Sequence, residues 1–366
     1  MTSSLPSSCS WFSFGVEIEF IIRFKISSFS TSKLETTQPS TYAQVIRSVH
    51  RYLIGCLRNT GVGVNDYLLP HRDLSSWTVK KLETVEVVKF NVELDEWGFC
   101  PVRLATPVMS YACPSFPEID DVLSYLNENF DILLEDSCCL NVYVGCTDTP
   151  DGKNRDSQGI RLAALQNFLL FVSLFEHQLN AIHLPARTTE TRRLRPSDLL
   201  PHPYFNVRSE IQRCSSVKAL CELWDGSAER LGPGSRLLSY SIRDMTAHYN
   251  GNVLESGNKT IRFGQHRATM DIWEIYHWVN LAGHIVRFVD RCEPWVWPLA
   301  MMFQPSSEHQ VKIQDINPID LFDAIGAIEQ GDYYDNRFYQ EELCRDMLTD
   351  ASLGLELLFS VNKGCA

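Results

Sequence analysis

The sequence predicts an α+β fold in which strands and helices mix without a strict βαβ rhythm. Some segments alternate apolar and polar residues, as half-buried strands do, and others repeat apolar residues at the spacing of an amphipathic helix. The chain has 366 residues, of which 44% are apolar, so it can bury a large core. We expect one main domain over residues 13–303, preceded by a flexible segment at 1–12 and followed by a helical extension at 304–366 that packs on the same domain.

Residues 13–24 form the first predicted strand. Glu17 and Glu19 alternate with Val16 and Ile18, so both carboxylates leave one face of the strand and the apolar residues take the other face. Two adjacent acids on an apolar backing repel each other unless a cation lies between them. In active sites that cation is usually Mg²⁺, but arginine can take its place.

The other elements follow from the same two periodicities. Val45, Val49, Leu53 and Leu57 recur every four residues and predict an amphipathic helix over 41–58. The remaining predicted helices cover 117–130, 159–184, 271–290 and the chain from 318 onward. The remaining predicted strands lie within 77–109, 138–144 and 259–266, where β-branched residues and interrupting glycine or proline are typical of short strands.

Charge and composition restrict the partners. The chain carries 33 basic and 45 acidic residues, a net charge of −12, which opposes binding to nucleic acid or to an anionic membrane surface. We therefore expect a small-molecule substrate, with a biosynthetic partner enzyme or a second copy of the chain as protein partners. The 12 cysteines form no C-x-x-C pair, which favours reduced thiols over disulfides or a zinc site.

The sequence shows neither a secretory signal nor a membrane-spanning segment. Residues 1–10 are rich in serine and proline, and they lack the basic start and apolar stretch of a secretory signal. No apolar run approaches the length of a membrane span. We expect a cytoplasmic protein.

Three other predicted strands repeat the two-faced pattern of the first. Arg103 lies between apolar neighbours, Asn141 and Tyr143 alternate with apolar residues, and Arg262 and His266 do the same further along the chain. If these strands share one sheet, their polar side chains line one concave surface together with the two glutamates.

At four places the sequence resembles the amidoligases that are common in fungi, distant relatives of glutamine synthetase and glutamate–cysteine ligase. Residues 15–20 (GVEIEF) resemble the opening strand of that family. Residues 103–107 are similar to its Glu-Leu-Val-Ser-Pro segment, 139–145 to its Gly-Leu-His-Val-His-Val-Gly segment, and 260–266 to its Thr-Ile-Glu-Phe-Arg-Gln-His segment. The resemblance spans residues 13–291, and four motifs in order are more specific than any one alone.

The resemblance implies a fold and an activity. The fold would be a curved antiparallel sheet of about six strands, with helices packed on its outer side. The activity would be ATP-dependent ligation of a carboxylate to an amine through an acyl phosphate, with Mg²⁺ ions held by strand carboxylates and a histidine.

The motifs depart from the family at the metal-binding positions. Arg103 and Arg262 stand where the family has glutamate, and Asn141 and Tyr143 stand where it has histidine. The nearest match to a further acidic position, within 89–92, is Asn91. Because each exchange of carboxylate for guanidinium makes the pocket two charges more positive, divalent ions would be repelled. We therefore predict ion pairs of Glu17 and Glu19 with Arg103 and Arg262, no metal and no cofactor; Mg²⁺ and ATP would be needed only if ligation is retained.

These comparisons suggest roles for individual residues. His266 is expected to share a strand face with Arg262 and to act as general acid or base, although a structural histidine explains it nearly as well. Tyr143 is expected either to donate a proton or to fill the space of an imidazole. The predicted catalytic residues are His266, Tyr143, Glu17 and Glu19, and the predicted substrate-binding residues are Arg103, Arg262, Asn141, Arg187 and Gln265.

Three functions are compatible with this pattern. The first is a diverged amidoligase-fold enzyme of fungal specialised metabolism that has lost ligation and performs acid/base chemistry, such as cyclisation or condensation, on a small carboxylate or amide. The second is an ATP-dependent carboxylate–amine ligase with an altered metal site. The third is a non-catalytic pseudoenzyme that binds a small molecule or a partner protein.

Overall fold

The fold is α+β, as predicted, and is built on one large sheet. A computed structural model of the protein describes residues 12–30, 41–66, 75–82, 95–111, 116–146, 160–183, 204–230, 238–246, 259–291 and 316–340. Within these ranges the sheet has nine strands, in the order β2-β3-β4-β1-β7-β9-β8, with β5 and β6 also paired to β1. All pairs are antiparallel except β2 with β3.

The strands differ in length, and the central one is the longest. Their bounds are β1 Phe12–Lys25, β2 Val64–Asp66, β3 Trp77–Lys81, β4 Trp97–Ala105, β5 Met109–Ser110, β6 Asp131–Leu133, β7 Cys139–Cys146, β8 Tyr240–Ser241 and β9 Thr260–Arg267. The expectation of about six strands was too low, because β2, β5, β6 and β8 have only two or three residues each and show too little alternation to be recognised.

Strand β1 gives the sheet two chemically different faces. Phe14, Val16, Ile18 and Phe20 on one face are at most 1% exposed and belong to the main hydrophobic core. The intervening residues, among them Glu17 and Glu19, point to the opposite face. Because the side-chain period of a strand is two, a slip of one residue would bury the acids under the helices, so the register is strongly specified.

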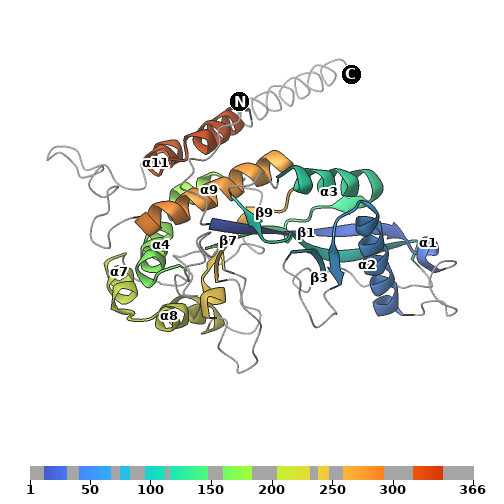
Figure 1. The fold of residues 1–366 in the computed structure, drawn as a ribbon, viewed down its shortest axis with the longest axis horizontal. Helices are drawn as coiled ribbons and strands as arrows, with labels where there is room; N and C mark the ends of the chain where they lie inside the picture. The colour runs from blue at the N-terminus through green and yellow to red at the C-terminus, as the bar shows by residue number, and fades with distance from the viewer. Residues whose placement is uncertain are drawn as a thin grey trace, which may run out of the picture.

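Several of the helices cover the apolar face of the sheet. Their bounds are α1 Ser27–Ser30, α2 Tyr42–Asn59, α3 Phe116–Asn129, α4 Leu162–Leu174, α5 Glu176–Ala181, α7 Tyr204–Arg213, α8 Val217–Arg230, α9 Ile272–Arg291 and α11 Pro318–Ala324, with the 3₁₀ helix η2 at Arg243–Thr246. Helix α9 packs against α3, α4, β1 and β7, and Figure 1 shows it lying along the sheet on the same side as α3. Its Trp278 and Ile285 are fully buried.

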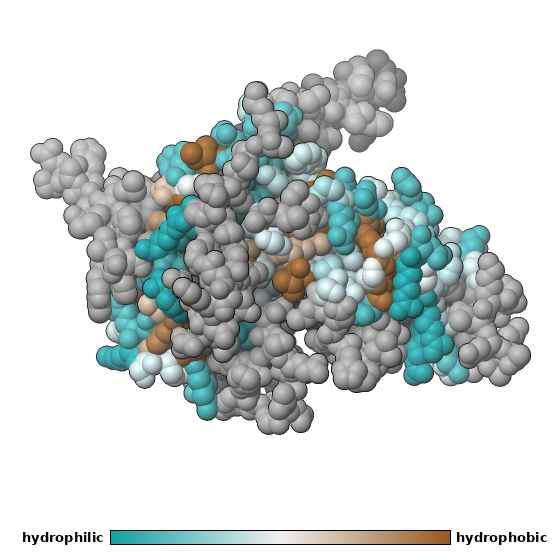
Figure 2. All heavy atoms as spheres, in the orientation of Figure 1, coloured by the Kyte–Doolittle hydropathy of each residue, from teal (hydrophilic) through white to brown (hydrophobic). Residues whose placement is uncertain are grey.

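Local sequence explains where several helices begin and end. Helix α2 starts at a capping box, in which the Thr41 hydroxyl accepts from the Gln44 backbone and the Gln44 side chain accepts from the Thr41 backbone. Most of its outward residues are polar, and Figure 2 shows hydrophilic surface along α2. The single helix predicted over 159–184 is instead two helices that meet at Phe175. Ser173 donates to the Leu169 carbonyl at 2.7 Å in the last turn of the first, a bond that often bends a helix.

The C-terminal part that the structure describes packs on α9. Residues 328–340 are helical, and two of their side chains contact α9 directly. The Tyr333 ring stacks on His277 with centroids 3.8 Å apart, and Arg337 forms an ion pair with Glu274 at 2.8 Å. At the other end of the chain, β1 begins at Phe12, and residues 1–11 lie outside the described ranges.

Among the described residues, no helix combines the length and the apolar character that crossing a bilayer requires.

Two helical glycines should respond oppositely to alanine substitution. A Cβ atom at Gly283 in α9 would lie 2.8 Å from the ring of Tyr111, which is held by a hydrogen bond to Val279, whereas a Cβ at Gly55 in α2 has no atom within 4 Å. We expect Gly283→Ala to lower the free energy of unfolding by about 1–3 kcal/mol through overpacking. We expect Gly55→Ala to raise it by about 0.5–1 kcal/mol, because alanine is the better helix former. Urea unfolding of both variants tests this, and equal effects would contradict the packing of Tyr111 on α9.

Candidate functional site

The face of the sheet opposite to the helices carries the polar residues of the four motif strands. In the register, Glu19 of β1 is opposite Arg103 of β4, and Glu17 is opposite Asn141 of β7. Tyr143 of β7 is in turn opposite Arg262 of β9. The sheet therefore brings together six of the residues singled out in the sequence, namely Glu17, Glu19, Arg103, Asn141, Tyr143 and Arg262, on one face.

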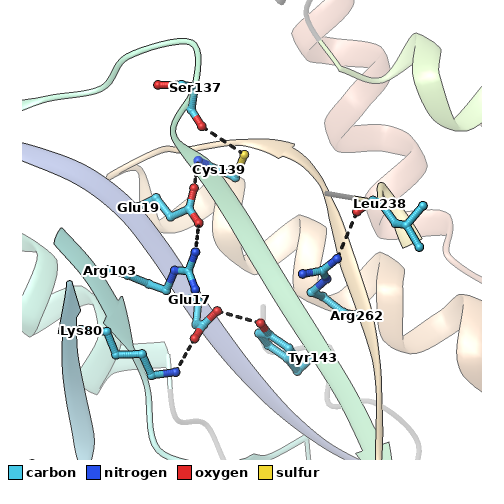
Figure 3. A network of polar contacts seen from close by, with 9 residues as sticks. All are labelled: Glu17, Glu19, Lys80, Arg103, Ser137, Cys139, Tyr143, Leu238 and Arg262. Carbon is cyan, nitrogen blue, oxygen red and sulfur yellow. Dashed lines mark hydrogen bonds and ion pairs between the residues drawn. The ribbon is translucent and has the colours of Figure 1, made fainter. Parts of the chain in front are cut away.

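Glu17 lies between a lysine and a tyrosine. The Lys80 ammonium donates to Glu17 Oε1 at 2.6 Å, and the Tyr143 hydroxyl donates to Glu17 Oε2 at 2.7 Å (Figure 3). Only 5% of Glu17 is exposed. Both oxygens of this buried carboxylate thus accept a hydrogen bond from a side chain on a different strand.

Glu19 is held in the same manner by two other donors. The Arg103 guanidinium donates from Nη2 to Glu19 Oε1 at 2.9 Å, and the Cys139 backbone N–H donates to Glu19 Oε2 at 3.1 Å (Figure 3). The predicted pairing of a glutamate with Arg103 is therefore confirmed. Glu19 is 1% exposed, so this is a buried ion pair.

The charges around Glu17 decide its ionisation. Burial by itself raises the pKa of Glu17, but the Lys80 and Arg103 charges and the two hydrogen bonds lower it by more, so the pKa lies below its ordinary value. Burial and the neighbouring Glu17 carboxylate raise the pKa of Tyr143 well above that of a free tyrosine. At neutral pH the pair therefore consists of a carboxylate that accepts and a phenol that donates.

Arg262 does not pair with either glutamate, contrary to the prediction. Its Nη2 donates to the Leu238 carbonyl at 3.4 Å, and its Nε is buried without a hydrogen-bond partner among the described residues. The acids within electrostatic reach of Arg262 come from other elements, Asp225 from α8 and Asp244 from η2. The role expected of Arg262 in pairing Glu17 belongs instead to Lys80, because β3 extends the sheet beyond β4 and carries a cation to that position.

The neighbouring Asp225 has an unusual environment for a carboxyl group. It accepts hydrogen bonds from the Ser241 hydroxyl at 2.6 Å and from the Ile242 backbone at 3.2 Å. Burial raises the pKa of Asp225 to about 6, although these bonds and the charge of Arg262 act against burial. Asp225 thereby fixes the short segment that leads from β8 into η2.

Asn141 is buried in the middle of the polar face. It is 2% exposed, and within the described part of the chain its Oδ1 has no hydrogen-bond partner. Its register neighbour on β1 is Glu17, whose two oxygens are already bonded to Lys80 and Tyr143.

His266 does not share a face with Arg262, so that prediction is wrong. The register between β7 and β9 shifts at a bulge, with Val142 opposite Phe263 before it and Leu140 opposite His266 after it. His266 therefore lies on the side of the core residue Leu140, where its ring contacts Trp278 of α9 at 5.6 Å between centroids. A strict alternation cannot anticipate an extra residue, although a glycine inside a strand, here Gly264, is a known sign of a bulge.

Gln265, predicted to bind substrate, is used within the protein. Its Oε1 accepts from the hydroxyl of Tyr240, and its Nε2 donates to Asn180 of α5. Tyr240 packs edge-on against Phe168 of α4 in the core, so Gln265 connects the strand to the helical layer. The remaining substrate-binding candidate, Arg187, and the position of Asn91 lie outside the described residues.

The Mg²⁺ ions that the resemblance implies do not fit these residues. Mg²⁺ is bound mainly through carboxylate and water oxygens in octahedral geometry. Here the four oxygens of Glu17 and Glu19 each accept from a protein donor, and two of those donors are cationic side chains. Within the described ranges, no three histidine, cysteine, aspartate or glutamate side chains are grouped so that they could hold a metal ion.

Sequence reasoning missed two charged residues of this face. Lys80 follows the buried Trp77 and Val79 on β3, so the alternation predicts that its side chain points away from the core. Its position near Glu17, however, depends on the pairing of β3 with β4. Asp244 comes from η2 and lies within electrostatic reach of Arg262, Glu17 and Lys80. No local pattern connects Asp244 with the strands.

Comparison with known proteins assigns the chain to no family. No family model matches the chain, and no curated protein gives a significant match. The resemblance to amidoligases therefore rests on the four motifs.

Breaking the buried ion pair on one side should destabilise the fold more than removing it from both sides. We expect Arg103→Met to lower the free energy of unfolding by about 3–5 kcal/mol, because Glu19 would stay buried without its counter-ion. The double variant Glu19→Gln with Arg103→Met should recover at least half of that loss. Urea unfolding measures both.

An exposed ion pair on the same strand provides the control. Arg23 pairs with Asp131 at 2.6 Å, and both side chains are more than 40% exposed. We expect Arg23→Met to change the free energy of unfolding by about 1 kcal/mol or less. If Arg103→Met behaved like Arg23→Met, the Glu19–Arg103 pair would not be buried as described.

Glu17 should make the stability of the protein depend on acid pH. Because its pKa is lower in the folded than in the unfolded protein, its contribution is fully present above the ordinary value of about 4.3 and is lost as the pH falls through the folded value. We expect the free energy of unfolding to fall more steeply between about pH 5 and pH 3 in the wild type than in Glu17→Gln. Urea unfolding across this pH range tests the prediction. The control is Glu222→Gln, at an exposed residue of α8. If the stability of the wild type and of Glu17→Gln changed in parallel with pH, the lowered pKa of Glu17 would be contradicted.

Proposed function

We propose that the polar face of the sheet binds a small molecule carrying a carboxylate or an amide, and that it does so without a metal ion. The observation that carries this proposal is the distribution of hydrogen bonds. The four oxygens of Glu17 and Glu19 are all bonded to protein donors, while Arg103 Nε, Arg262 Nε and Asn141 Oδ1 are buried without a partner among the described residues. Buried polar groups are rarely left unbonded, so three on one face favour a ligand there.

The charge balance supports a site without metal. The described charges that act on one another at this face are the cations Lys80, Arg103, Arg243 and Arg262 and the carboxylates Glu17, Glu19, Asp225 and Asp244. In a magnesium-dependent site the carboxylates would face metal ions, whereas here lysine and arginine neutralise them. A divalent ion would have to displace Lys80 and Arg103 first.

The arrangement of the motif strands supports an origin in an amidoligase-like protein. The four segments that resemble the family lie on β1, β4, β7 and β9. These strands are consecutive neighbours in the sheet, in the order β4-β1-β7-β9. Segments that are far apart in the sequence thus line one surface. This arrangement is expected if the surface derives from the active site of an amidoligase-like protein.

We place binding ahead of acid/base catalysis and of ligation. His266, the expected general acid or base, lies on the helix side of the sheet. Of the predicted catalytic residues, Tyr143 and the two glutamates remain on the polar face, and the Tyr143 phenol already donates to Glu17. Its raised pKa makes it a weak acid. The residues present are therefore better suited to holding a ligand than to moving its protons.

Isothermal titration calorimetry tests the proposal with glutarate, L-glutamate, L-glutamine and Mg-ATP as probes. We expect at least one of the three small molecules to bind, and its affinity to fall about tenfold or more in Arg262→Gln, because a hydrogen bond to a charged donor is lost. Mg-ATP should give no binding heat.

The matched control is Arg23→Gln, which removes the same charge from the same face of the sheet but at an exposed ion pair with Asp131. It should bind like the wild type. Micromolar binding of Mg-ATP that requires Mg²⁺ would overturn the proposal and favour the ligase.

A further inference from the structure

We infer that Asp225 of α8 is a positioning residue of the polar face, which acts through Arg262 and, as a carboxylate, competes with an anionic ligand for the charge of that arginine. The ligand is that of the proposed function, on which this inference rests. Three features carry it: the hydrogen bonds of Asp225, the place of Arg262 between two neighbouring strands, and the charges around both residues.

Helix α8 holds the backbone at the point where β8 leads into η2. The Trp224 indole N–H donates to the Tyr240 carbonyl at 3.0 Å. Asp225, the next residue of the helix, accepts from the Ser241 hydroxyl at 2.6 Å and from the Ile242 N–H at 3.2 Å. Because β8 is the last strand at this end of the sheet, α8 thus supplies bonds that a further strand would otherwise supply.

Ser241 connects Asp225 with Arg262. The serine and the arginine are opposite each other in the β8–β9 pair, so their side chains lie on the same face with Cβ atoms about 4.5–5.5 Å apart. On its other side, Arg262 is opposite Tyr143 of β7. Like the Tyr143 hydroxyl, which donates to Glu17 at 2.7 Å, the serine hydroxyl donates to a buried carboxylate. Arg262 therefore lies between two carboxylates, and one hydroxyl group stands before each of them.

The two carboxylates differ in how they are neutralised. Glu17 contacts the Lys80 ammonium at 2.6 Å, and its pKa lies below its ordinary value. Asp225 has no cation within 4 Å among the described residues. Burial raises the pKa of Asp225 to about 6, and the charges of Arg262 and Arg243 offset that rise only in part. Near neutral pH, Asp225 can therefore change its charge while Glu17 stays ionised.

The ionisable groups around this carboxyl come from three elements. Strand β9 contributes Arg262, and η2 contributes Arg243 and the exposed Asp244, which also acts on Arg262. On α8 itself, the Cys221 thiol donates to a backbone carbonyl, and Glu222 is exposed. Helix α4, which packs on α8 as well, carries no ionisable side chain. Arg262 is thus the cation that connects this group with the polar face.

The charge of Asp225 should therefore control how strongly Arg262 attracts an anion. When Asp225 is ionised, an anion bound at Arg262 brings a second negative charge close to a buried carboxylate, and like charges repel. When Asp225 is neutral, this repulsion is absent. Binding of an anion is then linked to uptake of a proton at Asp225, so the affinity should fall as the pH rises through about 6.

Calorimetric titration with L-glutamate and glutarate at pH 5 and pH 8 tests the inference in the wild type and in Asp225→Asn, which keeps the shape of the side chain without its charge. At pH 8 we expect Asp225→Asn to bind these acids about threefold to tenfold more tightly than the wild type, and at pH 5 nearly equally. The ionisation of the probe is common to both proteins and cancels. A purely structural role of Asp225 would instead make the variant bind more weakly.

The matched control is Trp224→Phe. It removes a hydrogen bond between α8 and β8 at the residue next to Asp225, but it removes no charge. This variant should bind the acids no more tightly than the wild type at pH 8, and its affinity should keep the wild-type dependence on pH.

Urea unfolding tests the coupling of Asp225 to Arg262 without any ligand. Because the pKa of Asp225 is about 6 in the folded protein and about 3.9 in the unfolded chain, its contribution to stability is fully present below about pH 3.9 and is lost as the pH rises through about 6. The wild type should therefore lose stability relative to Asp225→Asn between about pH 4 and pH 7. When both proteins also carry Arg262→Gln, this loss should be larger and should extend to higher pH, because no Arg262 charge then favours the carboxylate.

The outcomes distinguish this inference from the proposed function. Equal or weaker binding of the acids by Asp225→Asn at pH 8, or a stability difference that Arg262→Gln leaves unchanged, would overturn the role of Asp225 and leave a small-molecule site on this face. Binding of L-glutamine alone, with neither acid bound by either protein, would do the same. If L-glutamine, L-glutamate and glutarate all fail to bind at about 10 mM, both proposals are overturned.

Discussion

The structure depends on the neutralisation of two buried carboxylates by cations from neighbouring strands. Glu17 and Glu19 are on the central strand, nearly inaccessible to water, and each would destabilise the fold without its partner. Lys80 and Arg103 can reach them only if β3, β4 and β1 pair in one register. The ion pairs therefore couple the order of the strands to the electrostatics of the polar face, and they occupy the oxygens that a metal ion would need.

The alternation of polar and apolar residues was sufficient to predict much of the fold. It located the long strand β1 and helices α2, α3 and α9, and it put Glu17, Arg103, Asn141, Tyr143 and Arg262 on a common face. These predictions succeeded because each rests on a long periodic segment whose apolar side must face the core. The pairing of Glu19 with Arg103 followed once the two strands were assumed to be neighbours.

The remaining features depend on contacts that no local pattern records. Lys80 reaches Glu17 because β3 adds to the edge of β4, and Asp244 approaches the strands from a short 3₁₀ helix. His266 was misplaced because one extra residue in β9 reverses the alternation. The break at Phe175 depends on a side-chain bond within one helical turn. Short strands, bulges and edge pairings are decided by tertiary structure, and their sequence signals are correspondingly weak.

The bulge in β9 divides the strand into two parts that lie in different environments. Before it, Arg262 lies on the polar face; beyond it, Gln265 and His266 contact Asn180, Tyr240 and Trp278 in the interior. Under the proposed function, substitutions in the first part alter ligand binding, whereas those in the second part must preserve the interior network. Under the proposed function, a change of ligand would therefore fall on residues before the bulge, because the residues after it are held by interior contacts.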